Sequence, residues 1–268
     1  MTLPKQAPSA ATLSPERQPR SDTRIDATSA ASPGSATARR HPGDVVRLVA
    51  AGAVVAATAV VARHHGLGSF ERDSFRLVND LPGWLSVPVQ GVMQAGALAA
   101  VPVAAGAAVA AGRRPLARDV ACAGGAAWVA AKLIKLPVGR ARPAALLHAV
   151  LLRGGPQSGL GFPSGHAAVA AALAGAASPY LSRRGRRLAW ALVPAVGLAR
   201  IYVGAHLPVD VIGGAALGWG IAAAVHLLFG IDRSGADSEA VRRALEAAGR
   251  PLLALTRAGV DARGSVPF

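Results

Sequence analysis

The chain is poor in charge, in aromatic side chains and in cysteine. Of its 268 residues, 16% are charged, 4% are aromatic and only Cys122 is a cysteine. A soluble domain usually carries about a quarter charged residues, and one cysteine forms neither an intramolecular disulfide nor a cysteine-based zinc cage. With 52% hydrophobic residues, mostly Ala, Val and Leu, and a mean hydropathy of +0.37, the sequence is typical of a helical membrane protein.

Long apolar runs are missing from both ends. Residues 1–44, rich in Pro, Ser and Thr, are expected to form a disordered cytoplasmic tail. Residues 231–268 are a mixed polar tail, and the piece from 238 to 255 is amphipathic. It is either the start of a further domain or a partly ordered tail. Neither tail combines a basic run with interleaved aromatics, so no nucleic-acid partner is expected.

The middle region, 45–230, contains apolar runs of about the length that spans a membrane. The six runs are Val45–Ala62, Val89–Ala111, Asp119–Leu136, Ala167–Leu181, Leu188–Val203 and Val209–Gly230. They predict an all-α fold, an integral membrane bundle of about six transmembrane helices. Ser69–Leu85 mixes apolar and charged residues and is expected to form an interfacial amphipathic segment.

Arginines in the short loops predict the orientation. Gly112–Arg118 and Ser182–Arg187 are both rich in arginine and fall on the same side of a six-helix bundle. The positive-inside rule places these loops, and with them both termini, in the cytoplasm. The chain is therefore expected to be a multi-pass protein of the plasma membrane.

Ionisable residues near the ends of the predicted spans are costly in lipid and point to function. They are Lys135, Arg142, His166, Arg200, His206 and Asp210, and a Ser164-Gly165 turn directly precedes His166. With six spans, all of them lie at the extracytoplasmic face. Three cations, two histidines, a helix-starting Ser-Gly turn and one carboxylate at one face predict an anion site with acid–base groups.

Each group has a specific chemical use. Ser164 can cap a helix whose free N–H groups and positive end hold a phosphate oxygen, and Gly165 permits close approach. Lys135, Arg142 and Arg200 can neutralise a phosphoryl group and its transition state.

The histidines supply proton transfer and a nucleophile. Asp210 follows His206 by four residues, so its carboxylate can hold one imidazole nitrogen and leave the other as a nucleophile. His166 can then protonate the departing oxygen. No cluster of carboxylates is present in the sequence to bind divalent ions, so neither a metal nor another cofactor is expected.

These residues occur in three ordered blocks. The blocks are Lys135 to Arg142-Pro143, Pro163-Ser164-Gly165-His166, and Arg200 to His206 to Asp210. The pattern resembles the tripartite signature of the type 2 phosphatidic-acid phosphatase superfamily, which includes lipid phosphate phosphatases and vanadium haloperoxidases. The resemblance covers about residues 45–230. Ala199 departs from it, because the family usually has a serine before the third-block arginine.

The resemblance implies a helical bundle, no metal requirement and a division of roles. His206 would be transiently phosphorylated, Asp210 would orient it and His166 would be the general acid. The phosphate-binding residues would be Lys135, Arg142, Ser164, Gly165 and Arg200.

The sequence therefore predicts a metal-independent membrane phosphatase for a lipid phosphomonoester or diphosphate. Phosphatidic acid, phosphatidylglycerol phosphate and polyprenyl phosphates or diphosphates are all compatible substrates. The main alternative is a lipid-binding transporter or flippase without hydrolytic activity, which would need neither His206 nor Asp210. A vanadate-dependent haloperoxidase and an inactive scaffold are two further alternatives, disfavoured by the predicted spans and by the intact histidine pair.

Overall fold

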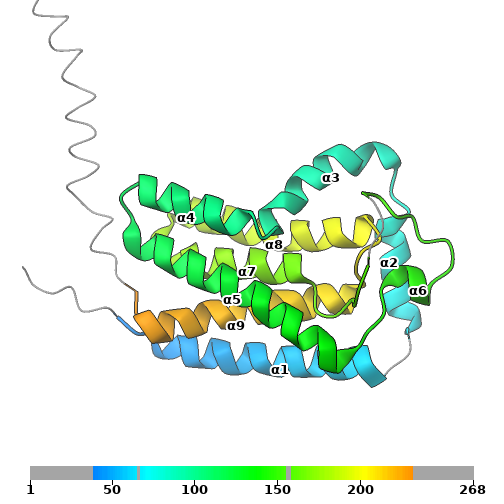
Figure 1. Ribbon diagram of the computed structural model, residues 1–268, viewed down its shortest axis with the longest axis horizontal. Helices are drawn as coiled ribbons and strands as arrows, with labels where there is room; N and C mark the ends of the chain where they lie inside the picture. The colour runs from blue at the N-terminus through cyan, green and yellow to red at the C-terminus, as the bar shows by residue number, and fades with distance from the viewer. Residues whose placement is uncertain (1–38, 65–66, 155–157, 232–268) are drawn as a thin grey trace, which may run out of the picture. The chain divides into compact units, whose positions relative to one another are not determined.

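The computed structural model describes residues 39–64, 67–154 and 158–231 (Figure 1). Within these ranges the chain is helical and has no strand beyond one isolated bridge between Arg39 and Ile231. The helices are α1 Pro42–His64, α2 Ser69–Asn79, α3 Ser86–Met93, α4 Ala100–Ala110, α5 Arg114–Val138, α6 Pro143–Leu146, α7 Gly165–Ala177, α8 Arg183–Tyr202 and α9 Pro208–Phe229. The all-α prediction is confirmed for the described residues, whereas the two predicted tails lie almost wholly outside them.

Helix α7 occupies the centre of the bundle. It packs against α5, α8 and α9, and α1 covers the other side of α9 (Figure 1). Most of the α7 sequence is alanine, the residue with the highest helix propensity, and its small side chains allow neighbouring backbones to approach closely. Because α7 is enclosed by other helices, its apolar surface contacts protein on most sides.

Among the described residues, fewer helices are long and apolar enough to span a membrane than the six that the sequence predicts. In the part of the chain that the structure describes, three helices are long and apolar enough to cross a membrane, and a bent pair spanning Gly83–Ala110 makes a fourth if it counts as one span. The 13 residues of α7 extend only about 20 Å, and α8 begins with several arginines. The predicted count of six therefore stays a prediction, although the chain has the apolar helices of a membrane protein.

The second predicted span is not the continuous helix that was expected over Val89–Ala111. It breaks after α3 into a 3₁₀ turn, Gln94–Gly96, and the two halves meet at 66°. A Cβ on Gly96 would lie 2.5 Å from the carbonyl oxygen of His166 and 2.7 Å from Val196 Cγ1. The break thus brings a glycine backbone against the first turn of α7, which a hydrophobicity pattern does not reveal.

Different segments of the chain meet at the two ends of the bundle. At one end, Arg39 and Ile231 pair through backbone hydrogen bonds of 3.2 and 2.9 Å. At the other end, α5 and α8 finish and α7 and α9 begin, with α2 and α6 beside them (Figure 1). Every candidate site residue lies at this second end.

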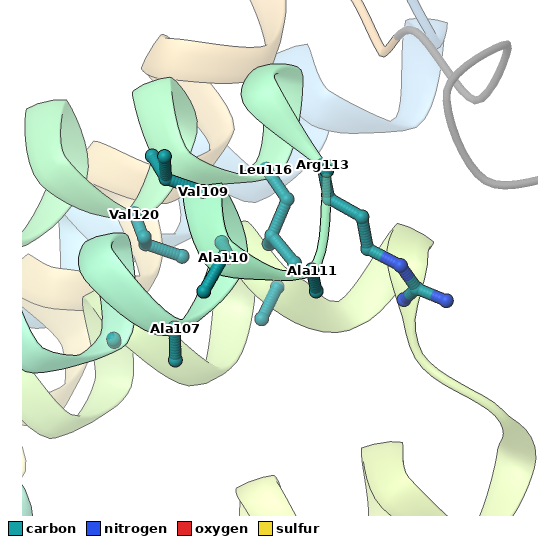
Figure 2. Close-up of a pocket in the computed structure, with 11 residues that line it drawn as sticks. Ala107, Val109, Ala110, Ala111, Arg113, Leu116 and Val120 are labelled. Carbon is teal, nitrogen blue, oxygen red and sulfur yellow. The ribbon is translucent and has the colours of Figure 1, made fainter. Parts of the chain in front are cut away.

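An apolar cavity of about 670 Å³ lies near the first end, where α4 turns into α5 (Figure 2). Alanines and Val109, Leu116 and Val120 line most of it, and Arg113 is the one charged residue in its lining. The Arg113 guanidinium donates a hydrogen bond of 3.3 Å to the carbonyl of Tyr180. None of the candidate site residues borders this cavity.

Replacing Gly218 by alanine is expected to lower the unfolding free energy by about 1–3 kcal/mol, because the close contact of α7 and α9 has no room for a methyl group. A Cβ there would overlap the carbonyl oxygen of Ala168. Gly125→Ala is the matched control, since no described atom outside the adjoining part of its own helix lies within 4 Å of its Cβ position. Thermal unfolding in detergent should show a lower Tm for Gly218→Ala and an equal or higher Tm for Gly125→Ala. Equal behaviour of the two variants would contradict this packing.

Candidate active site

The loop before α7 forms a helix start with open space in front of it. Ser164 is the N-cap of α7, and its Oγ accepts a 3.5 Å hydrogen bond from the backbone N–H of Ala167. Its own N–H donates to the carbonyl oxygen of Asp210 at 2.9 Å, which ties α7 to α9. Apart from the adjoining residues and backbone of its own helix, no described protein atom lies within 4 Å of a Cβ built on Gly165. The first-turn N–H groups of a helix lack intrahelical partners, so an anion can approach them here.

Lys135, near the end of α5, holds this loop in place. Its ammonium group donates to the carbonyl oxygens of Leu160 at 2.9 Å, Gly161 at 2.8 Å and Pro163 at 2.9 Å. An ammonium group has three N–H donors, so all three are directed at the backbone of the loop. The positive charge of Lys135 therefore lies directly behind the start of α7.

Two arginines add positive charge at the same end. Arg142 donates through Nε to the carbonyl of Ser158 and through Nη1 to that of Ala205, both at 2.8 Å. Arg200 is 6% exposed, and its Nη1 lies 2.9 Å from the Met93 sulfur. Arg142 thus connects the loop before α7 to the residue preceding His206, while Arg200 reaches the same region from α8.

His206 and Asp210 form the only histidine–carboxylate pair within ion-pair distance among the described residues. Asp210 Oδ2 lies 3.6 Å from His206 Nδ1 and accepts a 2.9 Å hydrogen bond from the N–H of Leu207. His206 lies between α8 and α9 and is 2% exposed, and burial lowers its pKa from 6.5 to about 4. Its imidazole is therefore neutral near pH 7, with Nδ1 toward the carboxylate and Nε2 on the opposite edge of the ring.

His166 is the second residue of α7. It lies close enough to His206, Arg142 and Arg200 to interact with them electrostatically. The structure therefore brings together the eight residues singled out by sequence, from α5, the loop after it, α7, α8 and the start of α9. The role of each remains a prediction.

Two charged residues at this site were not among the predicted site residues. Arg140 follows α5 and donates from Nη1 to Asp210 Oδ1 at 3.0 Å, and Glu71 on α2 binds Arg140 in turn. Glu71 falls in the segment expected to lie at the interface, and no motif marks it. Only the fold shows that one face of α2 is buried against the site.

The described residues contain no group of three His, Cys, Asp or Glu side chains arranged to hold a metal ion. Positive charge and N–H donors dominate this end of the bundle instead. The arrangement suits an anionic ligand such as a phosphate group.

Comparison with known proteins agrees with the arrangement. Residues 118–233 match the sequence profile of the PAP2 superfamily. Comparison with curated proteins gives no significant match. The chain is similar in fold to the first transmembrane PAP2 type phosphatidylglycerolphosphate phosphatase from Bacillus subtilis, with 20% identity, a TM-score of 0.57, and coverage of 67% of this chain and 94% of that one.

A second solved structure shares the fold. Aquifex aeolicus LpxE is 24% identical with a TM-score of 0.55, and the match covers 59% of this chain and 95% of the LpxE chain. Both similarities extend over nearly the whole of the other protein. The region 118–233, which contains all the predicted site residues, therefore matches the PAP2 superfamily, in agreement with the resemblance read from the three sequence blocks.

Proposed function

We propose that the protein is a membrane lipid phosphatase that hydrolyses a phosphomonoester or diphosphate of a lipid through a phosphohistidine at His206. The observation that carries the proposal is the buried His206–Asp210 pair, which shares one end of the bundle with His166, Lys135 and two arginines. The family match and the similar fold of a transmembrane phosphatidylglycerolphosphate phosphatase support the same reaction class. The site faces the extracytoplasmic side, and both termini are cytoplasmic.

The reaction divides into two displacements. In the first, His206 Nε2 attacks phosphorus, the bond from phosphorus to the leaving oxygen breaks, and His166 gives that oxygen a proton. In the second, water attacks the phosphohistidine, His166 takes a proton from the water, and phosphate leaves as the bond to Nε2 breaks. Asp210 stabilises the positive charge on the imidazole in both steps. Arg142, Arg200 and the start of α7 stabilise charge on the phosphoryl oxygens.

An apolar groove beside the site provides a place for a lipid chain. It has a volume of about 330 Å³ and lies between α3 and α8, with Val89, Leu198 and Tyr202 among its lining residues. Ala199, where the family usually has serine, also borders it, directly before the site residue Arg200. A lipid whose hydrocarbon chain lies in this groove would have its phosphate group near Arg200.

Ala195→Phe is expected to fill this groove and lower kcat/KM for a long-chain phosphatidic acid by about tenfold, a typical cost of overpacking. Ala191→Phe, one turn away on the exposed surface of α8 and outside the groove lining, is the matched control. The kcat/KM for a dibutyryl analogue should change little in either variant. Equal losses on both substrates would contradict chain binding in the groove.

The deciding experiment is phosphate release by purified protein in lipid–detergent micelles with a chelator present. Phosphatidic acid, phosphatidylglycerol phosphate and undecaprenyl diphosphate should be compared side by side. Turnover that resists the chelator supports the metal-independent reaction, and the preferred lipid names the substrate class. Loss of turnover with chelator would overturn metal independence. Absence of release from every lipid, together with lipid movement in vesicles, would favour the transporter or flippase alternative.

A further inference from the structure

A buried cluster of charges joins Asp210 to two residues that were not among the predicted site residues. Its members are Glu71, Arg140 and Asp210, whose side chains are 9%, 5% and 0% exposed. They come from α2, from the segment after α5 and from the first turn of α9. Burying ionised side chains is costly unless each is paired with good geometry, so the geometry of this cluster matters.

Arg140 bridges the two carboxylates. Its Nη2 donates to Glu71 Oε2 at 2.6 Å and its Nη1 to Glu71 Oε1 at 3.1 Å, a two-point contact. The same Nη1 also donates to Asp210 Oδ1 at 3.0 Å. A guanidinium group is planar with donors in fixed directions, so a glutamate that holds it at two points also fixes its direction toward Asp210.

The second oxygen of Asp210 faces the nucleophile. Oδ2 lies 3.6 Å from His206 Nδ1 and accepts the N–H of Leu207, while Oδ1 is held by Arg140. The Arg140 contact therefore fixes the rotation of the carboxylate group. Without it, nothing among the described side chains other than His206 would hold Asp210.

Glu71 contacts the same turn of α9 directly. Its Oε1 accepts a 3.1 Å hydrogen bond from the backbone N–H of Val209. One side chain on α2 thus supports Asp210 twice, through Arg140 and through the backbone one residue before it. Glu71 also lies outside the residues 118–233 that match the family.

We propose that Glu71 and Arg140 are positioning residues that set the orientation and charge of Asp210, and through it the orientation of the His206 nucleophile. The inference rests on the proposed phosphatase function. The contacts of Glu71 are with Arg140 and the first turn of α9, and Arg140 reaches the site through Asp210. Their replacement should therefore lower the rate of phosphoryl transfer more than the affinity for substrate.

The two residues should have opposite effects on the protonation of His206. The other charged and titratable groups around this histidine are Lys135 on α5, Arg142 in the following segment, His166 on α7, Arg200 on α8 and Asp210 on α9. Removing the positive Arg140 favours imidazolium, so the acidic limb of the kcat/KM profile moves to higher pH. Removing the negative Glu71 disfavours imidazolium, so the limb moves to lower pH. General loosening of the site does not produce opposite shifts.

The test compares Glu71→Gln and Arg140→Gln with the parent protein, with Asp73→Asn as the matched control. Asp73 is on the exposed side of α2, so its variant undergoes the same loss of a carboxylate away from the site. We expect kcat to fall roughly 10²-fold in both site variants, with KM within about twofold of the parent value. Asp73→Asn should match the parent in both constants.

Arg140→Lys provides a variant that keeps the charge if Arg140→Gln does not fold. It loses the two-point contact, so kcat should still fall, but the acidic limb should stay near that of the parent. Parental kcat in Glu71→Gln and Arg140→Lys, or acidic limbs that move in the same direction in both glutamine variants, would overturn the positioning role while leaving the phosphatase function intact. A parent protein that releases no phosphate would overturn the proposed function and, with it, this inference.

Discussion

His206→Gln is expected to lower phosphate release by at least about 10³-fold, because it removes the atom that bonds to phosphorus. Glutamine fits the volume of imidazole and leaves Asp210 with a hydrogen-bond donor, so the buried pair is not replaced by an empty space. Burial lowers the pKa of His206 to about 4, so the parent protein holds its nucleophile neutral and ready across the ordinary working range. KM should change far less than kcat.

The measurement combines steady-state phosphate release with trapping of the intermediate from a lipid labelled with ³²P. The parent should acquire a label that is stable in alkali and lost in acid, the behaviour of a phosphohistidine, and His206→Gln should acquire none. His148→Gln is the control, because His148 is exposed in the segment that follows α6 and is not a site residue. Label retained on His206→Gln would place the covalent step on another residue.

Much of this site could be predicted from the sequence because its chemistry depends on residue types at short fixed spacings. His206 and Asp210 are four residues apart at a helix start, so local geometry alone brings them together. Ser164 and Gly165 follow a proline and precede a run of alanines, which predicts a helix start with a capping side chain. Such features need no knowledge of how the helices pack.

The parts that escaped prediction depend on contacts between distant segments. Glu71 and Asp210 are brought to one guanidinium by the packing of α2 on the end of the bundle, although they are 139 positions apart in the sequence. The break at Gly96 likewise involves a distant segment, because Gly96 lies against the carbonyl of His166 on another helix. Lys135 was expected to neutralise phosphate, yet its three hydrogen bonds to the loop before α7 follow from the three-dimensional path of that loop.

His166→Gln should produce a loss that depends on the leaving group, which distinguishes a general acid from a residue that only binds phosphate. An alkoxide leaves poorly without a proton, so release from a lipid alcohol phosphate should fall about 10²- to 10⁴-fold. Nitrophenolate is a weak base that leaves without protonation. Cleavage of 4-nitrophenyl phosphate in the first step should therefore slow by less than about tenfold.

The second step gives a further signature. His166 also takes the proton from the attacking water, so His166→Gln should form the phosphohistidine from 4-nitrophenyl phosphate faster than it hydrolyses it. Rapid mixing should then show a burst of nitrophenol close to one per protein molecule, followed by slow turnover. The burst is expected in His166→Gln because its first step still has a good leaving group and stays fast. Its second step has lost the base that activates water and is slow. Equal losses on both substrates without a burst would assign His166 to phosphate binding and leave the proton to another donor.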